Sequence, residues 1–374
     1  MHKRVWVGIL IIVVVAVLAI VIRGTRPSNP GELTIGATLP LSGDAAVFGK
    51  NTQEGIDLAI SEINDNGGVL GQKVRVSYED TKALAKEGVT AYQKLTTVDR
   101  VPAIIDDSVS SVTLAMAPLA DRNHVVVLAT GATAPQISGV SKYVFRIWNS
   151  DAYEGEVIAQ HATSAMGLKN VAILYINNEY GKGLEGVFRS EFSRRGGRIA
   201  AAESFEQSST DVRTQLTKIR EASPDGLYLI GYPKEIGTAL RQAKELGVSA
   251  ALLGTVALHD QQLVESAGGA AEGLVFPFPK DPSGTQVEKF KTTFSAKYSK
   301  APPVLADVGY DAVKMIVGAI EASKGTSGEQ IRQGLTALKD YPGASGQMTF
   351  DKNGDVHKPM GIKVIQNGQF VWRN

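Results

Sequence analysis

The sequence of 374 residues contains no cysteine. This absence excludes disulfides, thiolate nucleophiles, cysteine-ligated metals and the lipid-attachment cysteine of a bacterial lipoprotein. An excess of either charge is also lacking, because 39 lysines and arginines face 38 acids and leave a formal net charge of +1. A chain so nearly neutral has no general attraction for nucleic acid, so we expect no nucleic-acid partner.

Motifs for catalysis are missing as well. The chain has no G-x-S-x-G, P-loop or kinase motif, and no histidine stands four residues from another zinc ligand. The G-x-G-x-x-G pattern of residues 181–186 has the outline of a dinucleotide site, but "NNEY" separates it from the preceding strand. A glycine-rich helix start is the favoured interpretation, with dinucleotide binding as the alternative. We therefore predict a protein that is not an enzyme and needs no metal or cofactor.

One long apolar run is present, at residues 5–22. As a helix it would span about 27 Å, close to the hydrocarbon thickness of a bilayer. It is longer than the apolar region of most signal peptides, and no A-x-A-like cleavage site is evident. We predict an N-terminal apolar helix that anchors the protein to the membrane, with a signal peptide cleaved near Gly24 to Pro30 as the alternative. Both interpretations place the rest of the chain outside the cytoplasm, in the periplasm or at the cell surface.

From Leu33 onward, short apolar runs alternate with segments of helical period. In residues 49–64, for example, Ile56, Ala59 and Ile63 fall on one helix face. The alternation predicts an α/β fold in which helices cover parallel sheets, and the length predicts two domains. The expected strands are residues 33–39, 73–80, 101–106, 125–130, 170–176, 198–205, 226–231 and 252–256.

The C-terminal residues have a different pattern, with Asn-Gly pairs at residues 353–354 and 367–368 that predict antiparallel hairpin turns. The first pair lies in "DKNGDVHK", where acidic residues have the spacing of a calcium loop. Val356 and Ile362 stand where such a loop needs glycine and glutamate. A hairpin turn is therefore the prediction.

Hydroxyl side chains follow two of the predicted strands. Ser108, Ser110 and Ser111 follow one strand, while Gly131 and Thr133 follow the next strand along the chain. Parallel sheets bind ligands beyond the carboxyl ends of their strands, and hydroxyls and free N–H groups at a helix start can hold a carboxylate. Ordinary helix capping is the alternative for either loop alone. The pairing of the two loops favours an anion-binding site.

Several segments, in this order, carry a resemblance: "PLSGDAAVFGKNTQEGIDLAISEINDNGGVLGQKV", "SSVTLAMAPLAD", "ATGATAP", "NEYGKGL", "LIGYPKEIGTALRQAKELG" and "AEGLVF". With them the chain resembles the branched-chain amino-acid-binding proteins of ABC importers, which have the type I periplasmic binding-protein fold. The resemblance implies two Rossmann-like lobes, joined by three hinge crossovers, that close over a ligand. After an N-terminal segment at residues 1–31, lobe 1 is expected at residues 32–149 and 280–346, and lobe 2 at residues 150–279 and 347–374.

The resemblance also implies roles for individual residues. Ser110 and Thr133 match the hydroxyls that hold the carboxylate of the ligand, and Gly131 matches a backbone carbonyl that faces its ammonium group. Tyr180 and Tyr232 match tyrosines that close over the ligand from the second lobe.

Phe48 matches an aromatic residue that lines the pocket, but one position departs from the family. After "LLG", Val256 or Ala257 stands where the amino-acid binders place a glutamate that pairs with the ammonium group. Either the ligand lacks an ammonium group, or Asp106 or Asp107, which precede the serine loop, supplies the missing charge. Other available acids are Glu179, Asp260 and Asp307.

These observations predict an extracytoplasmic solute-binding protein of an ABC importer, with the permease and ATPase subunits as partners. The expected ligand bears a carboxylate, and a branched-chain amino acid is the leading prediction. The alternatives are an aromatic or aliphatic acid or amide without an ammonium group, or a ligand-sensing ectodomain.

Overall fold

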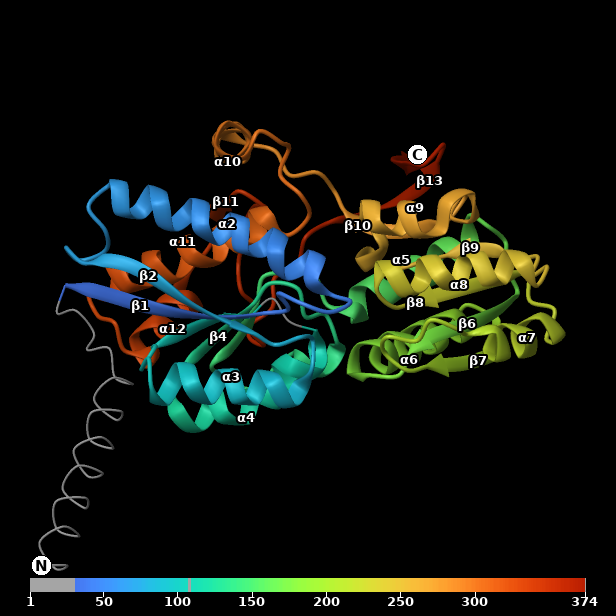
Figure 1. Ribbon diagram of the computed structural model, residues 1–374, viewed down its shortest axis with the longest axis horizontal. Coiled ribbons are helices and arrows are strands. Elements are labelled where there is room, and N and C mark those ends of the chain that lie inside the picture. The colour runs from blue at the N-terminus through green and yellow to red at the C-terminus, as the bar shows by residue number, and fades with distance from the viewer. Residues whose placement is uncertain (1–30, 107–108, 374) are drawn as a thin grey trace, which may run out of the picture.

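The computed structural model describes residues 31–106 and 109–373. Strands and helices alternate around two separate sheets, which lie one after the other along the long axis (Figure 1). The α/β class with parallel sheets is as predicted. Within the two described ranges, no helix is both long and apolar enough to cross a membrane. The predicted apolar helix at residues 5–22 lies outside them.

The first sheet has five parallel strands in the order β2-β1-β3-β4-β5. Helices cover both faces, with α3 and α4 on one side and α2, α11 and α12 on the other (Figure 1). Since both faces are covered, the central strands β3 and β4 are wholly buried. The strands are β1 (Glu32–Leu39), β2 (Lys73–Asp80), β3 (Ala103–Asp106), β4 (Val126–Ala129) and β5 (Val144–Arg146), and the helices are α2 (Ala46–Asp65), α3 (Ala85–Thr97), α4 (Ser110–Asn123), α11 (Ala306–Ser323) and α12 (Gly328–Ala337).

The second sheet has seven strands in the order β14-β13-β10-β9-β8-β6-β7. Its strands are parallel except at one edge, where β13 is antiparallel to β10 and β14 to β13. The strands are β6 (Asn170–Ile176), β7 (Arg198–Phe205), β8 (Gly226–Ile230), β9 (Ala251–Leu253), β10 (Val275–Pro279), β13 (Met360–Gln366) and β14 (Gln369–Arg373). The covering helices are α5 (Asp151–Ser164), α6 (Glu179–Arg194), α7 (Arg213–Glu221), α8 (Pro233–Glu245) and α9 (Gln261–Ala267).

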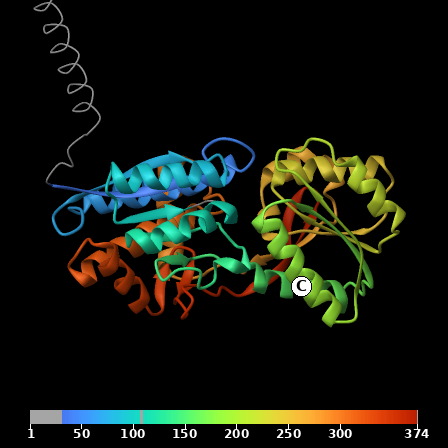
Figure 2. The same ribbon diagram turned by 90° about the horizontal axis from the view of Figure 1, so that it is seen from below.

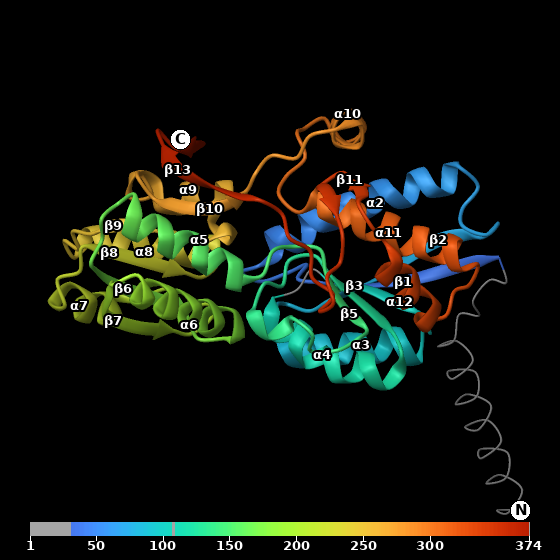
Figure 3. The ribbon, with the colours of Figure 1, turned by 180° about the vertical axis from the view of Figure 1, so that it is seen from behind.

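The chain passes between the two sheets three times (Figures 2 and 3). The passages follow β5, join β10 to α10 (Thr285–Tyr298), and precede β13. They lie side by side, because the amide side chain of Asn149 and the backbone of Lys358 exchange two hydrogen bonds, and the Lys280 N–H donates to the Pro359 carbonyl at 2.8 Å. These three passages are where the proposed hinge crossovers would lie.

The predicted lobe boundaries stay a prediction. After residue 346 the chain still contacts the half built on the first sheet, where β12 (Gly346–Met348) pairs with β11 (Tyr341–Gly343). The ring of Phe350 also packs on Phe145 of β5, with centroids 5.0 Å apart. A third crossover would therefore lie beyond Phe350 and not at residue 347.

The predicted strands occur as β1 to β4 and β6 to β9, while β5 and β10 were not predicted. The hairpin at residues 367–368 is present, since Asn367 and Gly368 join β13 to β14 with φ of 52° and 72°. The hairpin predicted at residues 353–354 is wrong. β12 takes β11 as its partner, so Asn353 and Gly354 form a turn within a loop.

Glycine allows the close packing of α2 on α11. A Cβ atom at Gly55 would lie 1.8 Å from the Ala306 carbonyl oxygen. The matching approach occurs at Gly309, where a Cβ would lie 2.4 Å from the Thr52 carbonyl oxygen. We expect Gly55→Ala to push the helices apart and to lower the free energy of unfolding by about 1–3 kcal/mol.

Exposed Gly186 in α6 provides the matched control, because no atom lies within 4 Å of its ideal Cβ. Gly186→Ala should raise the free energy of unfolding by up to about 1 kcal/mol, as expected for a helix interior. Urea denaturation of both variants measures the difference. Equal effects of the two changes would contradict the packing argument.

Candidate functional site

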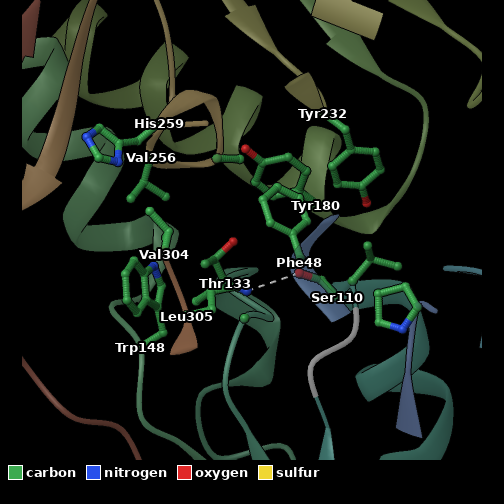
Figure 4. Close-up of a pocket in the computed structure, with 14 residues that line it drawn as sticks. Phe48, Ser110, Thr133, Trp148, Tyr180, Tyr232, Val256, His259, Val304 and Leu305 are labelled. Carbon is green, nitrogen blue, oxygen red and sulfur yellow. Dashed lines mark hydrogen bonds between the residues drawn. The ribbon is translucent and has the colours of Figure 1, made fainter. Parts of the chain in front are cut away.

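A cleft opens beside the carboxyl ends of strands from both sheets (Figure 4). Six of the eight predicted site residues line it, namely Phe48, Ser110, Gly131, Thr133, Tyr180 and Tyr232. The remaining walls are mostly apolar and include Pro40, Val109, Trp148, Val256, Ala257, Val304 and Leu305. The structure therefore brings residues from both halves of the chain around one space, and their contacts with a ligand stay predictions.

Ser110 and Thr133 form one hydrogen-bonded unit in the cleft. Ser110 is the first residue of α4, and its Oγ accepts hydrogen bonds from the N–H groups of Thr133 at 3.2 Å and Ala134 at 3.0 Å. This arrangement leaves the hydroxyl hydrogen of Ser110 available to an acceptor. With the Thr133 hydroxyl and the start of α4 beside it, the unit suits a carboxylate.

Buried Arg146 supports the same loop from behind. Its Nη1 donates to the carbonyls of Thr133 at 2.8 Å and Ala134 at 3.0 Å, and its Nη2 donates to the Ser138 hydroxyl at 2.8 Å. Its Nε donates to Asp355 at 2.9 Å, and the ion pair is almost fully buried. The guanidinium therefore fixes the loop that carries Thr133.

Three aromatic rings form the wall opposite this loop (Figure 4). Tyr180 from α6 stacks on Tyr232, which precedes α8, with centroids 6.0 Å apart, and Phe48 from α2 meets Tyr232 edge-on at 6.3 Å. The Tyr180 hydroxyl donates to Thr255 Oγ1 at 2.9 Å. Burial raises the pKa of both tyrosines, so they act as neutral phenols. Because Phe48 comes from the other half of the chain, the wall spans both halves.

The sequence prediction missed two buried acids at the start of α5. The Asp151 N–H donates to the Thr133 carbonyl at 2.8 Å, and neither carboxylate oxygen has a hydrogen-bond partner in the part of the chain that the structure describes. Glu154, one turn later, accepts from the Val256 N–H at 2.9 Å. Both side chains are at most 1% exposed. The acids lie behind two cleft residues, Thr133 and Val256.

Burial raises the pKa of both carboxyl groups. For Asp151 the neighbouring Thr133 hydroxyl and the Arg146 guanidinium offset the increase only in part. For Glu154 the charge of Asp151 adds to the effect of burial. "NSDAYEG" reads in the sequence as an ordinary capped helix start, and Ser150 does cap α5. Only the folded chain brings this start beside Thr133.

The acids named from the sequence lie elsewhere. Asp106 does not line the cleft, which contradicts its predicted place there, because the hydroxyls of Thr38 and Thr113 donate to its wholly buried carboxylate. Asp107 lies outside the described residues. The other acids that the sequence offered as partners of the ammonium group do not line the cleft either. Glu179 is exposed, Asp260 caps α9, and Asp307 lines a second cavity.

A family model for periplasmic binding proteins matches residues 32–369. The chain belongs to this family. Its members are solute-binding proteins and not enzymes, and the family implies an extracytoplasmic location.

The glycines at residues 181–186, the alternative dinucleotide site, lie within the first turns of α6. There a Cβ at Gly181 would come within 1.9 Å of the Ile176 carbonyl oxygen.

Named relatives agree with this assignment. A Leu/Ile/Val-binding protein homologue of Brucella melitensis is 28% identical over 88% of this chain and 89% of its own. The crystal structure of a leucine-binding protein from Thermotoga maritima has a TM-score of 0.86 and 30% identity over 91% of this chain and 98% of that one. A Streptococcus pneumoniae branched-chain amino-acid transporter substrate-binding protein, in complex with isoleucine, has a TM-score of 0.82 and 26% identity over 91% and 97% of the two chains.

We expect Thr133→Ala to weaken ligand binding without unfolding the protein. The loss of a hydrogen bond to a charged group costs about 1.5–3 kcal/mol, which is roughly ten- to a hundredfold in affinity. Thr133→Ser keeps the hydroxyl and should retain most of the affinity. Calorimetry with a confirmed ligand measures both variants, and an unchanged affinity of the alanine variant would remove Thr133 from the site.

Proposed function

We propose that this protein captures a branched-chain amino acid in the cleft and delivers it to an ABC importer. The observation that carries the proposal is the combination, in one apolar cleft, of a carboxylate-binding unit at Ser110 and Thr133 with buried acids behind it. An α-amino acid carries both complementary charges on one carbon atom. The names of the relatives in Brucella and Thermotoga support the same ligand class.

The apolar walls support an aliphatic side chain. Trp148, Val256 and Leu305 line the side of the cleft away from Ser110 (Figure 4). Full burial of a leucine-sized side chain contributes about 1.5–3 kcal/mol. Val256 or Ala257 stands at the position of the glutamate that the resemblance leads one to expect, and both are apolar residues that line the cleft.

Asp151 is the acid that we assign to the ligand ammonium group. Its backbone is bonded to Thr133, and its carboxylate oxygens make no hydrogen bond within 3.5 Å among the described residues, although the Thr133 hydroxyl and the Arg146 guanidinium lie close enough to lower its pKa. A buried carboxylate without a partner is costly, and an ammonium group beside it would offset that cost. The raised pKa of Asp151 is consistent with this unpaired state.

A thermal-shift screen of the full chain tests the function. L-leucine, L-isoleucine and L-valine should raise the melting temperature by mass action, since they bind only the folded state. The keto acid of leucine and its amide should raise it much less, because each lacks one of the two charges. An equal effect of the keto acid would favour the alternative ligand without an ammonium group, and no effect of any compound would contradict the proposal.

Asp151→Asn should separate binding from stability. Removal of one partner of a buried charge pair costs about 2–5 kcal/mol, so amino-acid affinity should fall at least thirtyfold while keto-acid affinity holds. Because burial raises the pKa of Asp151, the folded state holds its proton more tightly than the unfolded state. The wild type without ligand therefore loses stability as pH rises above the usual carboxyl range.

Asp151→Asn should not show this loss of stability with rising pH, because asparagine carries no titrating carboxyl group. At pH 8 its melting temperature without ligand should exceed that of the wild type, and the difference should vanish at low pH, where the carboxyl group is neutral in both states. Exposed Asp211→Asn serves as the control and should change neither quantity. Undiminished leucine affinity in the Asp151 variant would exclude this acid as the ammonium partner.

The apolar run at residues 5–22 supports a further proposal, that the protein stays attached to the membrane. Mass spectrometry of the membrane fraction from the native host should then find the intact N-terminus. A mature chain that begins between Gly24 and Glu32 would instead support a cleaved signal peptide.

A further inference from the structure

A second cavity, open to solvent, lies beside the passages between the two sheets. We call it the crossing cavity. Residues 279–282 of the second passage and Lys358 of the third line it. It shares Trp148, His259, Val304 and Leu305 with the ligand cleft, all on the side away from Ser110 (Figure 4). The two spaces therefore adjoin across these four side chains.

Positive charge exceeds negative charge around the crossing cavity. Four lysines and two acids line it, namely Lys280, Lys291, Lys358, Lys363, Asp281 and Asp307. Lys280 and Lys291 are exposed, whereas Lys358 and Lys363 are each only 7% exposed. In the described ranges, no carboxylate lies within 4.0 Å of either buried ammonium group.

Lys358 has a polar neighbourhood that spreads its charge. Its Nζ donates to Ser345 Oγ at 2.8 Å, and the Ser345 hydroxyl donates to the buried carboxylate of Asp311 at 2.6 Å. Burial lowers the pKa of Lys358, while the charges of Asp307 and Asp311 act in the opposite direction. This lysine is therefore compensated, in part, through one hydroxyl.

Lys363 has only neutral direct neighbours. Its Nζ lies 3.1 Å from His259 Nε2 and 4.6 Å from the ring centroids of both Phe278 and Trp372. Burial lowers the pKa of Lys363, and the charge of Asp281 offsets this effect only in part. The Asp281 carboxylate accepts a hydrogen bond from the Trp372 indole N–H at 2.9 Å. An ammonium group in this setting has spare hydrogen-bond donors and no direct anionic partner.

His259 provides a neutral contact for Lys363 at the boundary of the two spaces. Burial, together with the charge of Lys363, lowers the pKa of His259 to about 3, so its imidazole is neutral at physiological pH. Since Nε2 faces the ammonium group of Lys363, we assign it as the acceptor, which places the ring proton on Nδ1. Nδ1 is buried and has no hydrogen-bond partner among the residues that the structure describes, and its N–H is directed away from Lys363, so the charge of Lys363 alone is available to an anion.

We propose that the crossing cavity is a second anion site, which binds a carboxylate carried on an aromatic or aliphatic body. Lys363 supplies the charge, while Trp148 and Phe278 provide aromatic walls, with centroids 6.3 Å apart. The carboxylate can come from a separate organic acid or from the far end of a longer ligand whose α-carbon lies in the cleft. None of its lysines lines the cleft, so binding of a separate acid is independent of the proposed amino-acid function, whereas binding of a longer cleft ligand rests on that function.

Calorimetric titration of the full chain with benzoate tests the proposal. Wild-type protein should bind benzoate, and Lys363→Met should weaken that binding at least tenfold. Lys291→Met is the matched control, because this lysine lines the same cavity but is exposed. It should change the affinity less than twofold. Lys363→Gln repeats the measurement if the methionine variant fails to fold, as judged by circular dichroism.

Two further titrations identify the source of the carboxylate. Benzoate binding that persists in saturating L-leucine indicates a separate acid. If L-2-aminoadipate binds and its affinity falls at least tenfold in Lys363→Met while that for leucine holds, the carboxylate is the far end of a cleft ligand. Because benzoate is first titrated without an amino acid, failure of the proposed amino-acid function leaves this result unaffected.

Three results would overturn the second anion site. In the first case, neither benzoate nor L-2-aminoadipate binds wild-type protein. In the second case, Lys363→Met and Lys291→Met weaken binding equally, which indicates only general attraction to positive charge. In the third case, Thr133→Ala abolishes benzoate binding while Lys363→Met does not, which would place the anion in the carboxylate unit of the cleft.

Discussion

The buried guanidinium of Arg146 is the constraint on which the cleft depends. It joins three segments: the end of β5, the nearby loop at Thr133 and Ala134, and the distant chain at Asp355 before the third passage. A buried ion pair contributes little net stability when compared with apolar packing, but the loss of one partner leaves a costly unpaired charge. Its fork of donors sets the position of the Thr133 carbonyl, and this carbonyl in turn accepts the N–H of Asp151. The carboxylate unit and the buried acid are therefore fixed by one side chain.

This dependence explains which parts were predictable from the sequence. Long strands such as β1 and β6 appear as apolar runs followed by helical period, and the loops after them are local features. β5 has only three residues, and β10 contains Pro277 and Pro279, which argue against a strand. The prolines are tolerated because β10 pairs with β9 through Val275 alone. A local sequence pattern does not show which strands become neighbours in a sheet.

The residues of the candidate site also differ in how far the sequence could predict them. Ser110 and Thr133 follow predicted strands, and Phe48 and the two tyrosines match positions of the family that the sequence resembles, so their place at the cleft could be predicted. The acids could not be assigned, since Asp106 and Asp151 both stand near helix starts in the sequence. Three-dimensional packing distinguishes them: the hydroxyls of two threonines donate to Asp106, whereas the carboxylate of Asp151 makes no hydrogen bond within 3.5 Å in the described chain. Neither acid lines the cleft itself, so hydrogen-bond satisfaction, which no local pattern encodes, is what favours Asp151 over Asp106 as the partner of a ligand.

The contacts that close the mouth of the cleft are weak, and this suits capture and release. The Ser208 hydroxyl and Lys234 from one half both approach Asp44 from the other, the lysine at 3.8 Å, and both contacts are exposed. Exposed ion pairs contribute about 0–1 kcal/mol, and an edge-on aromatic pair such as Phe48 with Tyr232 about 0.5–1.5 kcal/mol. The hydrogen bonds between the passages lie in the protein interior. Opening at the mouth therefore costs less than separation at the passages, so the two halves are expected to move as bodies about the passages and to expose the cleft to solvent.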